Sequence, residues 1–400
     1  MSVTRLRRSV GALTGRGRGR VLASVSVGWF LLLGMRFVVP SILPTITEGF
    51  GASDSQAGLA ITVLWVTYAA MQFPAGYYAD RLGERVLLTG GLIISAVGLL
   101  AYPFTPTFAL FVVVTGIFGL GTGLFGPPRG TVISKTYDEN DGAAFGAMLG
   151  AGSLGAALLP AVAALALATL GWRVTLAAAA PVLFVAAVAT WWVIPDTRRN
   201  PGRAHEPIRV VLRQVAAAVR DWRVALAAVG SMLMLFAFQG VTAFLTTYLV
   251  DVKGFSQATA GTLLGVLFLV GATSQVLGGG LADRFGTPRV LFVISLLSTV
   301  PLFAVPMLDG RLALAVASAA IGVRMSIGPV SNAYIIDLLP DATEGSSWGA
   351  LRTVLFLAGS FGSTLVGYMA DAQLFDAAFY VLGAITASVA VLYLFLPERS

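Results

Sequence analysis

The 400-residue chain has no cysteine, one histidine and few charged side chains, and each shortage excludes a class of protein. Without cysteine, neither a disulfide framework nor a thiolate metal site is possible. The single histidine, His205, lies in a polar stretch, so the sequence offers no nucleophile–base pair or metal cluster for an enzyme. Charged residues make up 11% of the chain, whereas soluble domains carry about 25%. Because this small number of charges cannot cover a surface that faces water, lipid must be the main solvent for much of this chain.

The sequence also lacks signatures of cofactor and nucleic-acid binding. It contains no GxxxxGK[ST] phosphate loop, so we expect no ATP, no other cofactor and no metal. The net charge of +7 comes mostly from arginine, but the arginines lie between apolar runs. We therefore interpret this charge as a signal of membrane topology and expect no nucleic-acid partner.

Long apolar runs make up most of the chain. A helix needs about 20 mostly apolar residues to cross a bilayer. Twelve segments meet this requirement and predict an all-α integral membrane protein with 12 transmembrane helices. They cover residues 21–47, 57–79, 86–102, 108–134, 143–168, 174–194, 224–250, 258–280, 289–307, 312–338, 347–369 and 376–396. The first run is too long for a signal peptide, so the basic stretch 1–20 is interpreted as a cytoplasmic N-terminus.

Basic residues fall unevenly on the two sides of the predicted bundle. With a cytoplasmic N-terminus and alternating helices, the side opposite the cytoplasm holds only Arg173, Lys253 and Arg311. Nearly all other arginines and lysines then lie in cytoplasmic segments. The positive-inside rule therefore predicts a cell-membrane protein with both termini in the cytoplasm.

The longest polar stretch, 196–223, separates six predicted helices from six and divides the chain into halves 21–195 and 224–397. Its apolar residues recur at helical spacing, which predicts an amphipathic helix on the anionic inner leaflet. These residues are Ile208, Val211, Leu212, Val215, Val219 and Trp222. We interpret the stretch as a passive linker, with a regulatory site as the alternative.

The two halves repeat the same landmarks in the same order. GYYADRLGER begins at residue 76, and GGLADRFGTPR begins at residue 279. A Gly-Pro pair at 126–127 returns at 328–329, AAFGAML at 143 matches SSWGALR at 346, and Gly58 matches Gly261. Each half is therefore a six-helix unit, and a duplicated membrane unit is typical of alternating-access transporters.

The repeated GxxxDRxGxR segment falls in a predicted cytoplasmic turn after the second helix of each half. Its residues are Gly76, Asp80, Arg81, Gly83 and Arg85 in the first copy and Gly279, Asp283, Arg284, Gly286 and Arg289 in the second. An aspartate there can face the N-terminus of a helix that starts on the same side, which stabilises it by about 0.3–1 kcal/mol. We expect these contacts to hold one half against the other, and to break when that side opens.

With these residues, the chain resembles the major facilitator superfamily, and LGWR at 170–173 is also typical of it. The resemblance covers essentially the whole chain. It implies the superfamily's pseudo-twofold bundle, with a central cavity that opens to each side in turn and is lined by helices 1, 4, 7 and 10. Two segments of other members are absent: an Arg-x-x-Gln-Gly segment around 118–123, and a Gly-Pro pair in the fifth helix. Both absences weaken a drug/proton antiporter interpretation.

Arginines within the predicted spans point to the cargo. Arg36 lies mid-way along helix 1 and Arg324 mid-way along helix 10, whereas no Asp or Glu lies in the middle of any span. An intramembrane charge costs about 2.5–3.5 kcal/mol on insertion scales, and a guanidinium matches carboxylate or phosphate. We therefore expect the cavity to bind an anion, with Arg36 and Arg324 as its counter-charges. Arg129 and Arg352 lie nearer the cytoplasmic ends, and we expect them to extend to the interface.

Further candidates for the substrate site follow from helical spacing and from the repeat. Gln239 is the counterpart of Arg36 in the second half. Trp65, Tyr68 and Gln72 form one stripe along helix 2, and Asn332 lies in helix 10 with Arg324; these side chains could face the cavity or pack between helices.

The predicted function is secondary active transport of a small organic or inorganic anion by alternating access, by a monomer in the lipid bilayer. Symport, exchange and uniport all remain open. The alternative is efflux of drugs or hydrophobic compounds by proton antiport, and a sensor that transports nothing is a third possibility. The solute, the direction of transport and the coupling ion do not follow from the sequence.

Overall fold

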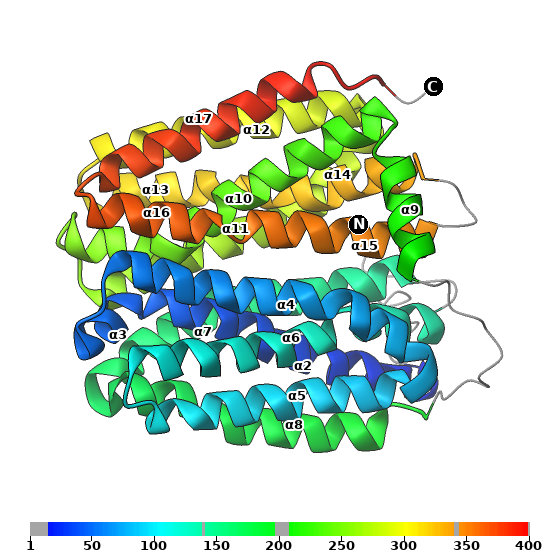
Figure 1. Cartoon of the computed structure of the whole chain (residues 1–400), viewed down its shortest axis with the longest axis horizontal. Helices are drawn as coiled ribbons and strands as arrows, with labels where there is room; N and C mark the ends of the chain where they lie inside the picture. Colours follow the sequence, from blue (N-terminus) through cyan, green and yellow to red (C-terminus); the bar gives the residue numbers. More distant parts are fainter. Residues whose placement is uncertain (1–14, 138–140, 197–207, 340–343, 399–400) are drawn as a thin grey trace.

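The structure, a computed structural model, describes residues 15–137, 141–196, 208–339 and 344–398 (Figure 1). Helices account for nearly all of this part of the chain, and no strand occurs in it. The first half contains α2 (Arg18–Ser41), α3 (Leu43–Phe50), α4 (Asp54–Leu82), α5 (Glu84–Ala101), α6 (Phe108–Thr136), α7 (Asp141–Ala177) and α8 (Ala180–Val193). Helix α9 (Ile208–Ala218) follows. The second half contains α10 (Trp222–Asp251), α11 (Gln257–Phe285), α12 (Thr287–Ala304), α13 (Arg311–Gly322), the 3-10 turn η4 (Val323–Ser326), α14 (Ile327–Ile336), α15 (Glu344–Gly359), α16 (Gly362–Asp371) and α17 (Phe375–Tyr393).

Among the described residues, 11 helical segments are long and apolar enough to cross a membrane. One of them, Gly142–Val193, has 52 residues and includes both α7 and α8. A helix of that length extends about 78 Å, more than twice the thickness of a bilayer core of about 30 Å. Gly171 interrupts it with a φ of 68° and a ψ of 161°. The predicted twelve crossings therefore require this segment to be counted as two.

The internal repeat is visible in the backbone as well as in the sequence. Gly51 and Gly254, at equivalent places in the two halves, both have positive φ, 63° and 70°. Two residues later, the hydroxyls of Ser53 and Ser256 each accept a hydrogen bond from a backbone N–H in the first turn of α4 or α11. These N-caps satisfy donors that a helix start leaves unpaired. Each half thus begins its second long helix with the same turn.

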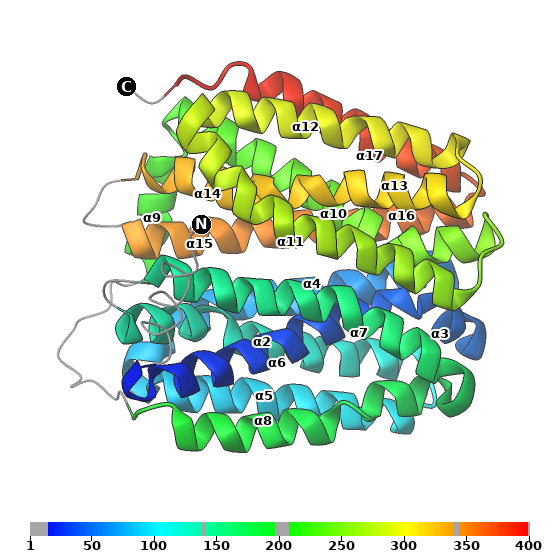
Figure 2. The ribbon, with the colours of Figure 1, turned by 180° about the vertical axis from the view of Figure 1, so that it is seen from behind.

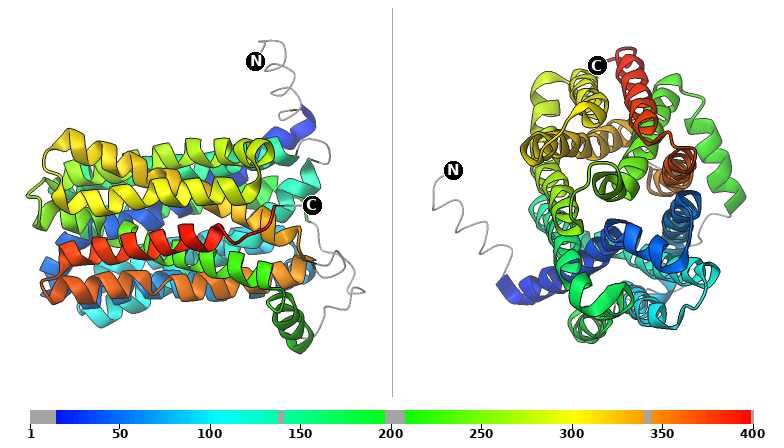
Figure 3. Two further views of the ribbon diagram at one scale, coloured as in Figure 1. Left: turned by 90° about the horizontal axis from the view of Figure 1, so that it is seen from above. Right: turned by 90° about the vertical axis from the view of Figure 1, so that its left-hand side faces the viewer.

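The two halves lie side by side, and each runs the length of the bundle (Figure 1). Figure 2 shows the same arrangement from behind, and the end-on view in Figure 3 shows the helices of both halves arranged around the middle of the molecule. The start of α2 and the end of α17 lie at the same end of the bundle (Figure 3). We call this end the terminus side and the opposite end the far side.

On the far side, α4 of the first half packs closely on α15 and α16 of the second half. The hydroxyl of Thr62 lies 2.8 Å from that of Ser363 and donates to the carbonyl oxygen of Ser360 at 3.1 Å. A Cβ at Gly58 would lie 2.5 Å from the carbonyl oxygen of Ser363. Only glycine permits this approach, which brings the two backbones together as small residues do between membrane helices.

A carboxylate completes this far-side contact. Asp371, at the end of α16, accepts hydrogen bonds from the backbone N–H groups of Asp54 at 2.8 Å and Ser55 at 3.0 Å. These N–H groups belong to the first turn of α4, where donors lack helical partners and the helix dipole favours negative charge. Asp371 therefore joins the end of one half to the helix start of the other.

The second seam between the halves, α7 against α11, is also closed on the far side. A Cβ at Gly265 would lie 2.5 Å from the carbonyl oxygen of Ala157, and one at Gly261 would lie 3.4 Å from that of Pro160. The amide of Gln257, at the start of α11, donates to the carbonyl oxygen of Ser41 at the end of α2. Both seams therefore block passage through the far end of the bundle.

The central linker contains the predicted helix. Helix α9 packs against α15, and Val215 contacts the hydrophobic core of the second half. Asp221 then caps α10, and its hydrogen bonds with Arg223 lower the pKa of the Asp221 carboxyl below its usual value. The prediction of a helix in this stretch is confirmed, while its contact with a membrane stays a prediction.

Candidate functional site

A cavity of about 460 Å³ lies between the two halves, in the part of the bundle nearer the terminus side. Helices α6 and α7 of the first half form one wall, and α10, α11, η4, α14 and α15 of the second half form the rest. Most lining side chains are apolar. The polar ones are Arg129, Ser231, Gln275, Arg324, Ser331, Asn332 and Arg352, and no Asp or Glu is found among the described residues of the lining. Because the far side is closed, we infer that the cavity opens toward the terminus side.

Three arginines line the cavity, and the guanidinium groups of two of them, Arg129 and Arg324, are only partly satisfied. Arg129 is 7% exposed, its Nη1 donates to the carbonyl oxygen of Gly126 at 2.8 Å, and its Nε has no partner among the described residues. Arg324 is 3% exposed, its Nη2 donates to the carbonyl oxygen of Met234 at 2.9 Å, and its Nη1 has no partner there. A guanidinium has five N–H donors, so both side chains retain capacity for an acceptor.

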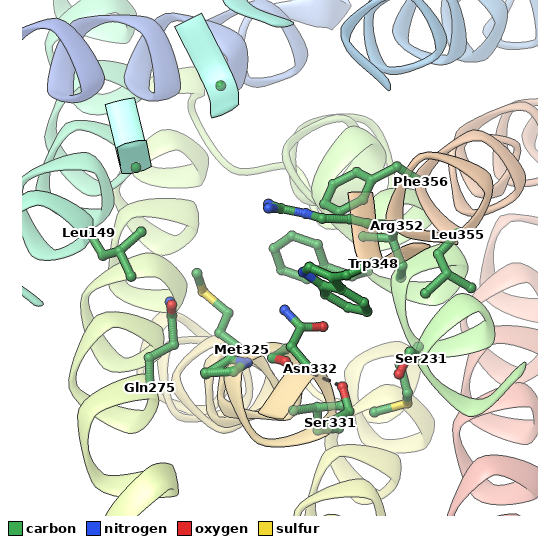
Figure 4. Close-up of a pocket in the computed structure, with 18 of the residues that line it drawn as sticks. Leu149, Ser231, Gln275, Met325, Ser331, Asn332, Trp348, Arg352, Leu355 and Phe356 are labelled. Carbon is green, nitrogen blue, oxygen red and sulfur yellow. Dashed lines mark hydrogen bonds between the residues drawn. The ribbon is translucent and has the colours of Figure 1, made fainter. Parts of the chain in front are cut away.

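The third arginine, Arg352 on α15, is half-buried and extends into the open space (Figure 4). Its guanidinium carbon lies 5.4 Å from the ring centre of Phe356 one turn further along the helix. Asn332 also points into the cavity, and Gln275 lies on another wall (Figure 4). Arg129 is buried at the cavity wall, so the prediction that it reaches the membrane interface is wrong, whereas for the half-buried Arg352 it stays a prediction.

Arg36 lies behind the cavity wall instead of in it. The side chain is 1% exposed, and its Nε and Nη1 have no partner among the described residues. Its guanidinium carbon lies 4.1 Å from the ring centre of Tyr68, 4.8 Å from that of Trp65 and 5.0 Å from that of Trp29. These cation–π contacts, each worth about 0.5–2 kcal/mol, replace a carboxylate partner.

Aromatic rings connect Arg36 to the cavity. The ring of Trp29 also lies 3.6 Å from the guanidinium carbon of Arg129, so one indole contacts two arginines. Tyr68 packs edge-on against Phe356, which lines the cavity. Trp65, Tyr68 and Arg36 thus form one cluster directly behind the cavity lining.

The remaining predicted substrate residues divide between cavity and core. Asn332 and Arg324 line the cavity, as expected. Gln72 packs between α4 and α6, where its Nε2 donates to the carbonyl oxygen of Gly123 at 3.4 Å. Gln239 is 1% exposed and does not line the cavity, and neither amide atom has a partner among the described residues. Neither Gln72 nor Gln239 lines the cavity in this conformation, and their role in substrate binding stays a prediction.

In the first copy of the repeated motif, the glycine has a clear structural reason. Gly83 joins α4 to α5 with a φ of 81° and a ψ of 150°, a conformation that only glycine adopts easily. Arg81 donates to the hydroxyl of Tyr77 at 2.9 Å, and Arg85 lies 4.1 Å over the ring of Trp191. The side chain of Asp80 lies outside the described residues, and a Cβ at Gly76 would contact Pro127 at 3.9 Å.

The second copy repeats this turn. Gly286 has a φ of 88° between α11 and α12. Arg289 pairs with Glu398 at 2.8 Å, Arg284 lies 5.2 Å from the ring of Phe285, and Asp283 is exposed. A Cβ at Gly279 would meet nothing within 4 Å. The described contacts of both copies stay within their own half, on the side where the cavity is open, so the gating role stays a prediction.

One buried ion pair near the first motif was not anticipated. Glu84, at the start of α5, is fully buried and pairs with Lys135 near the end of α6. The pair ties two helices of the first half together next to the Gly83 turn. Sequence alone shows both charges near helix ends, but not that they meet.

The chain matches the Major Facilitator Superfamily over residues 25–363 and, in a second match, over residues 256–400. It belongs to this superfamily. It is therefore a multi-pass membrane transporter and not an enzyme, as the sequence predicted. Within the superfamily layout, however, the first helix contributes no residue to the cavity lining, whereas the fifth, eighth and eleventh helices (α7, α11 and α15) do.

Two relatives and one solved structure are similar to the chain over most of its length. An uncharacterized MFS-type transporter of Bacillus subtilis is 27% identical, covering 88% of this chain and 87% of that protein. A probable sulfoacetate transporter of Cupriavidus necator is 24% identical, covering 95% of this chain and 94% of that protein. A bacterial homolog of the human lysosomal transporter Spinster, solved in an inward-facing and occupied conformation, superposes with a TM-score of 0.77 at 17% identity and covers 95% of this chain and 96% of that one.

Proposed function

We propose that this superfamily member is a secondary transporter whose cargo is a small organic anion. The observation that carries the proposal is the charge of the cavity lining. Arg129 of the first half and Arg324 and Arg352 of the second line the cavity, and none of the acidic side chains that the structure describes lines it. An anion held between them would contact both halves at once, as alternating access requires of a cargo.

The energetics of buried arginine support an anionic cargo. A charge within the membrane costs about 2.5–3.5 kcal/mol on insertion scales, and an opposite charge offsets part of that cost. Arg129 and Arg324 keep unpartnered N–H groups although both are almost fully buried. The planar guanidinium binds carboxylate, sulfonate or phosphate oxygens through paired hydrogen bonds.

The apolar part of the lining supports an organic cargo. Phe238, Met325, Trp348, Leu355 and Phe356 line the cavity beside the arginines. The volume of about 460 Å³ lies within the range typical of small-molecule sites. A hydrated inorganic ion would leave these surfaces uncovered, whereas the carbon skeleton of an organic acid would contact them. One relative is described as a probable sulfoacetate transporter, and sulfoacetate is such an acid.

Arg36 contributes to this site from behind the lining. The indole of Trp29 lies near its guanidinium and also near that of Arg129, and an indole ring is attracted to both cations. We propose that Arg36 holds Trp29, and through it Arg129, in place and raises the positive potential of the cavity. Gln239, Trp65, Tyr68 and Gln72 act as packing partners in this conformation.

The transport cycle follows from the two ends of the bundle. We infer that the terminus side is cytoplasmic, in accordance with the arginine distribution, so that this conformation faces inward in the cell membrane. Breaking the far-side contacts at Asp371 and Thr62 would open the cavity outward, while the Asp80 and Asp283 turns would close the cytoplasmic side. The part of the lining that the structure describes carries no acid that could bind a proton, so a coupled proton would travel on the cargo, unless another anion is exchanged. The protein functions as a monomer in this proposal.

Uptake into proteoliposomes tests the proposal. Purified protein is reconstituted and offered a panel of radiolabelled organic acids, inorganic anions and organic cations, with and without a pH gradient. We expect uptake of an organic acid, a reduction of at least about tenfold in Arg324→Gln, the equivalent of about 1.4 kcal/mol, and partial recovery in Arg324→Lys. Arg311→Gln, at an exposed far-side arginine, is the matched control and should leave uptake unchanged. Uptake of cations alone, or full activity of Arg324→Gln, would contradict the proposal.

A second candidate is export of hydrophobic compounds by proton antiport, which the apolar part of the lining favours. This function needs no arginine in the cavity. Overexpression that raises resistance to uncharged or cationic compounds, and that survives Arg324→Gln, would favour the exporter over the anion carrier.

A further inference from the structure

A second concave region lies on the outer surface of the bundle, between α7 and α11. This groove has a volume of about 550 Å³ and is lined by Ala147, Gly150, Ala151, Leu154, Leu269, Ala272, Thr273, Val276 and Leu277. Thr273 is the only polar residue among the described residues of the lining, and its hydroxyl donates to the carbonyl oxygen of Leu269 at 3.2 Å. The groove therefore offers a purely apolar surface to its occupant.

The groove exists because α7 and α11 diverge along their length. On the far side, the two backbones are in contact at Gly265 and Ala157. Toward the terminus side, a Cβ at Gly150 or Gly146 would meet nothing within 4 Å. The seam between the halves is thus closed at one end and open at the other, and the groove occupies the open part.

The groove faces lipid and not the central cavity. On each helix, neighbouring residues face either the cavity or the groove. Leu149 and Gln275 line the cavity, whereas Gly150 and Val276 line the groove. Val276 is 75% exposed and Leu277 59% exposed. In a membrane-spanning segment such apolar exposure means contact with hydrocarbon. An unfilled groove would forfeit dispersion contacts that an acyl chain supplies.

A basic side chain lies at the terminus-side end of the face of α11 that lines the groove. Arg284 follows Leu277 by two helical turns, about 10 Å along the axis, and so lies on the same side of α11. It is exposed, and no ion pair joins it to another described residue. The only charged neighbour in sequence is the exposed Asp283, which points about 100° away around the helix. Arg284 is therefore placed at the level of lipid headgroups, with its donors free for a phosphate.

We propose that the groove is a binding site for an anionic phospholipid, with one acyl chain between α7 and α11 and its phosphate on Arg284. The groove lies across the seam between the two moving halves. Closure of the terminus side would bring α7 and α11 together and expel the chain, so the bound lipid favours the conformation that is open on this side. The inference depends only on membership of the transporter superfamily and is independent of the anion cargo.

Quenching by brominated lipids tests the site, and the absence of native cysteine makes single-cysteine labelling simple. Thr273→Cys places a bimane label in the groove. Leu297→Cys, on α12 at a similar depth from the terminus side and 55% exposed, is the matched lipid-facing control. Both proteins are reconstituted in phosphatidylcholine vesicles that contain a small fraction of phosphatidylglycerol, with bromine on the acyl chains of one lipid or the other.

We expect brominated phosphatidylglycerol to quench the Thr273→Cys label with a preference of about fivefold over brominated phosphatidylcholine, which corresponds to about 1 kcal/mol for one basic residue near lipid phosphate. The Leu297→Cys label should show no preference. Adding Arg284→Gln should remove the preference at position 273, and Arg284→Lys should keep most of it. Equal quenching at both positions, or a preference that survives Arg284→Gln, would overturn the proposal.

Discussion

The far-side contact at Asp371 gives the sharpest prediction about conformational equilibrium. Its carboxylate accepts two backbone N–H bonds, at 2.8 and 3.0 Å, from the first turn of α4 in the other half. Hydrogen bonds to a charged acceptor contribute about 1.5–3 kcal/mol when buried, and exposure of Asp371 places each at the lower end. In Asp371→Asn the charge is lost and only one amide oxygen remains as an acceptor. We expect a loss of about 1–2 kcal/mol, a shift of roughly 5- to 30-fold toward the state open on the far side.

Distance measurements between spin labels can follow this shift. Phe104 and Met307 belong to far-side turns of opposite halves, and each is 77% exposed. Labels at Phe104→Cys and Met307→Cys should report a single distance in the parent protein and an added longer distance in Asp371→Asn. Asp309→Asn is the matched control, because Asp309 pairs with Lys253 within the second half at 3.1 Å. Identical distance distributions for the parent and Asp371→Asn would refute the assignment of Asp371 as a far-side clamp.

Three further substitutions test other parts of the structure. Gly58→Val should prevent closure of the far side, because even a Cβ at this position would lie 2.5 Å from a backbone oxygen of α16. The same pair of spin labels should then show mainly the longer distance. A distance distribution like that of the parent protein would contradict the close packing of α4 on α16. Gly83→Ala should lower stability by about 1–3 kcal/mol through backbone strain, seen as a lower thermal midpoint, whereas Gly280→Ala, with open space and ordinary φ, should not. Glu84→Gln leaves Lys135 without its buried partner and should cost about 1–3 kcal/mol in the same thermal assay, and an unchanged midpoint would argue against the ion pair.

The sequence was sufficient for the architecture because membrane spans obey a simple rule of length and polarity. The apolar runs predicted the helices, and the repeated landmarks predicted the two halves. The predicted span 21–47 appears as two helices, since the chain breaks at Ile42 before Pro44. Apolar runs also fail to reveal the break inside the continuous segment Gly142–Val193, because a break at the single residue Gly171 does not change the average hydropathy.

The candidate site was predicted only in its chemistry. The excess of arginine over acid was visible in the sequence, but not which arginines face the cavity. These helices are apolar on all sides, so no amphipathic pattern fixes their rotation. Arg129 was expected to reach the interface, yet it packs on Trp29 at the cavity wall. Arg36 was expected in the cavity, yet three aromatic rings enclose it. Only tertiary packing decides between these positions.

Counterflow tests most directly whether the arginine-lined cavity carries an organic anion between the two sides of a membrane. Proteoliposomes are loaded with an unlabelled organic acid identified by the uptake panel, and labelled acid is added outside. Parent protein should accumulate label transiently, Arg311→Gln should do the same, and Arg324→Gln and Arg129→Gln should not. Counterflow that persists in both cavity variants, or that occurs only with cations, would contradict the claim.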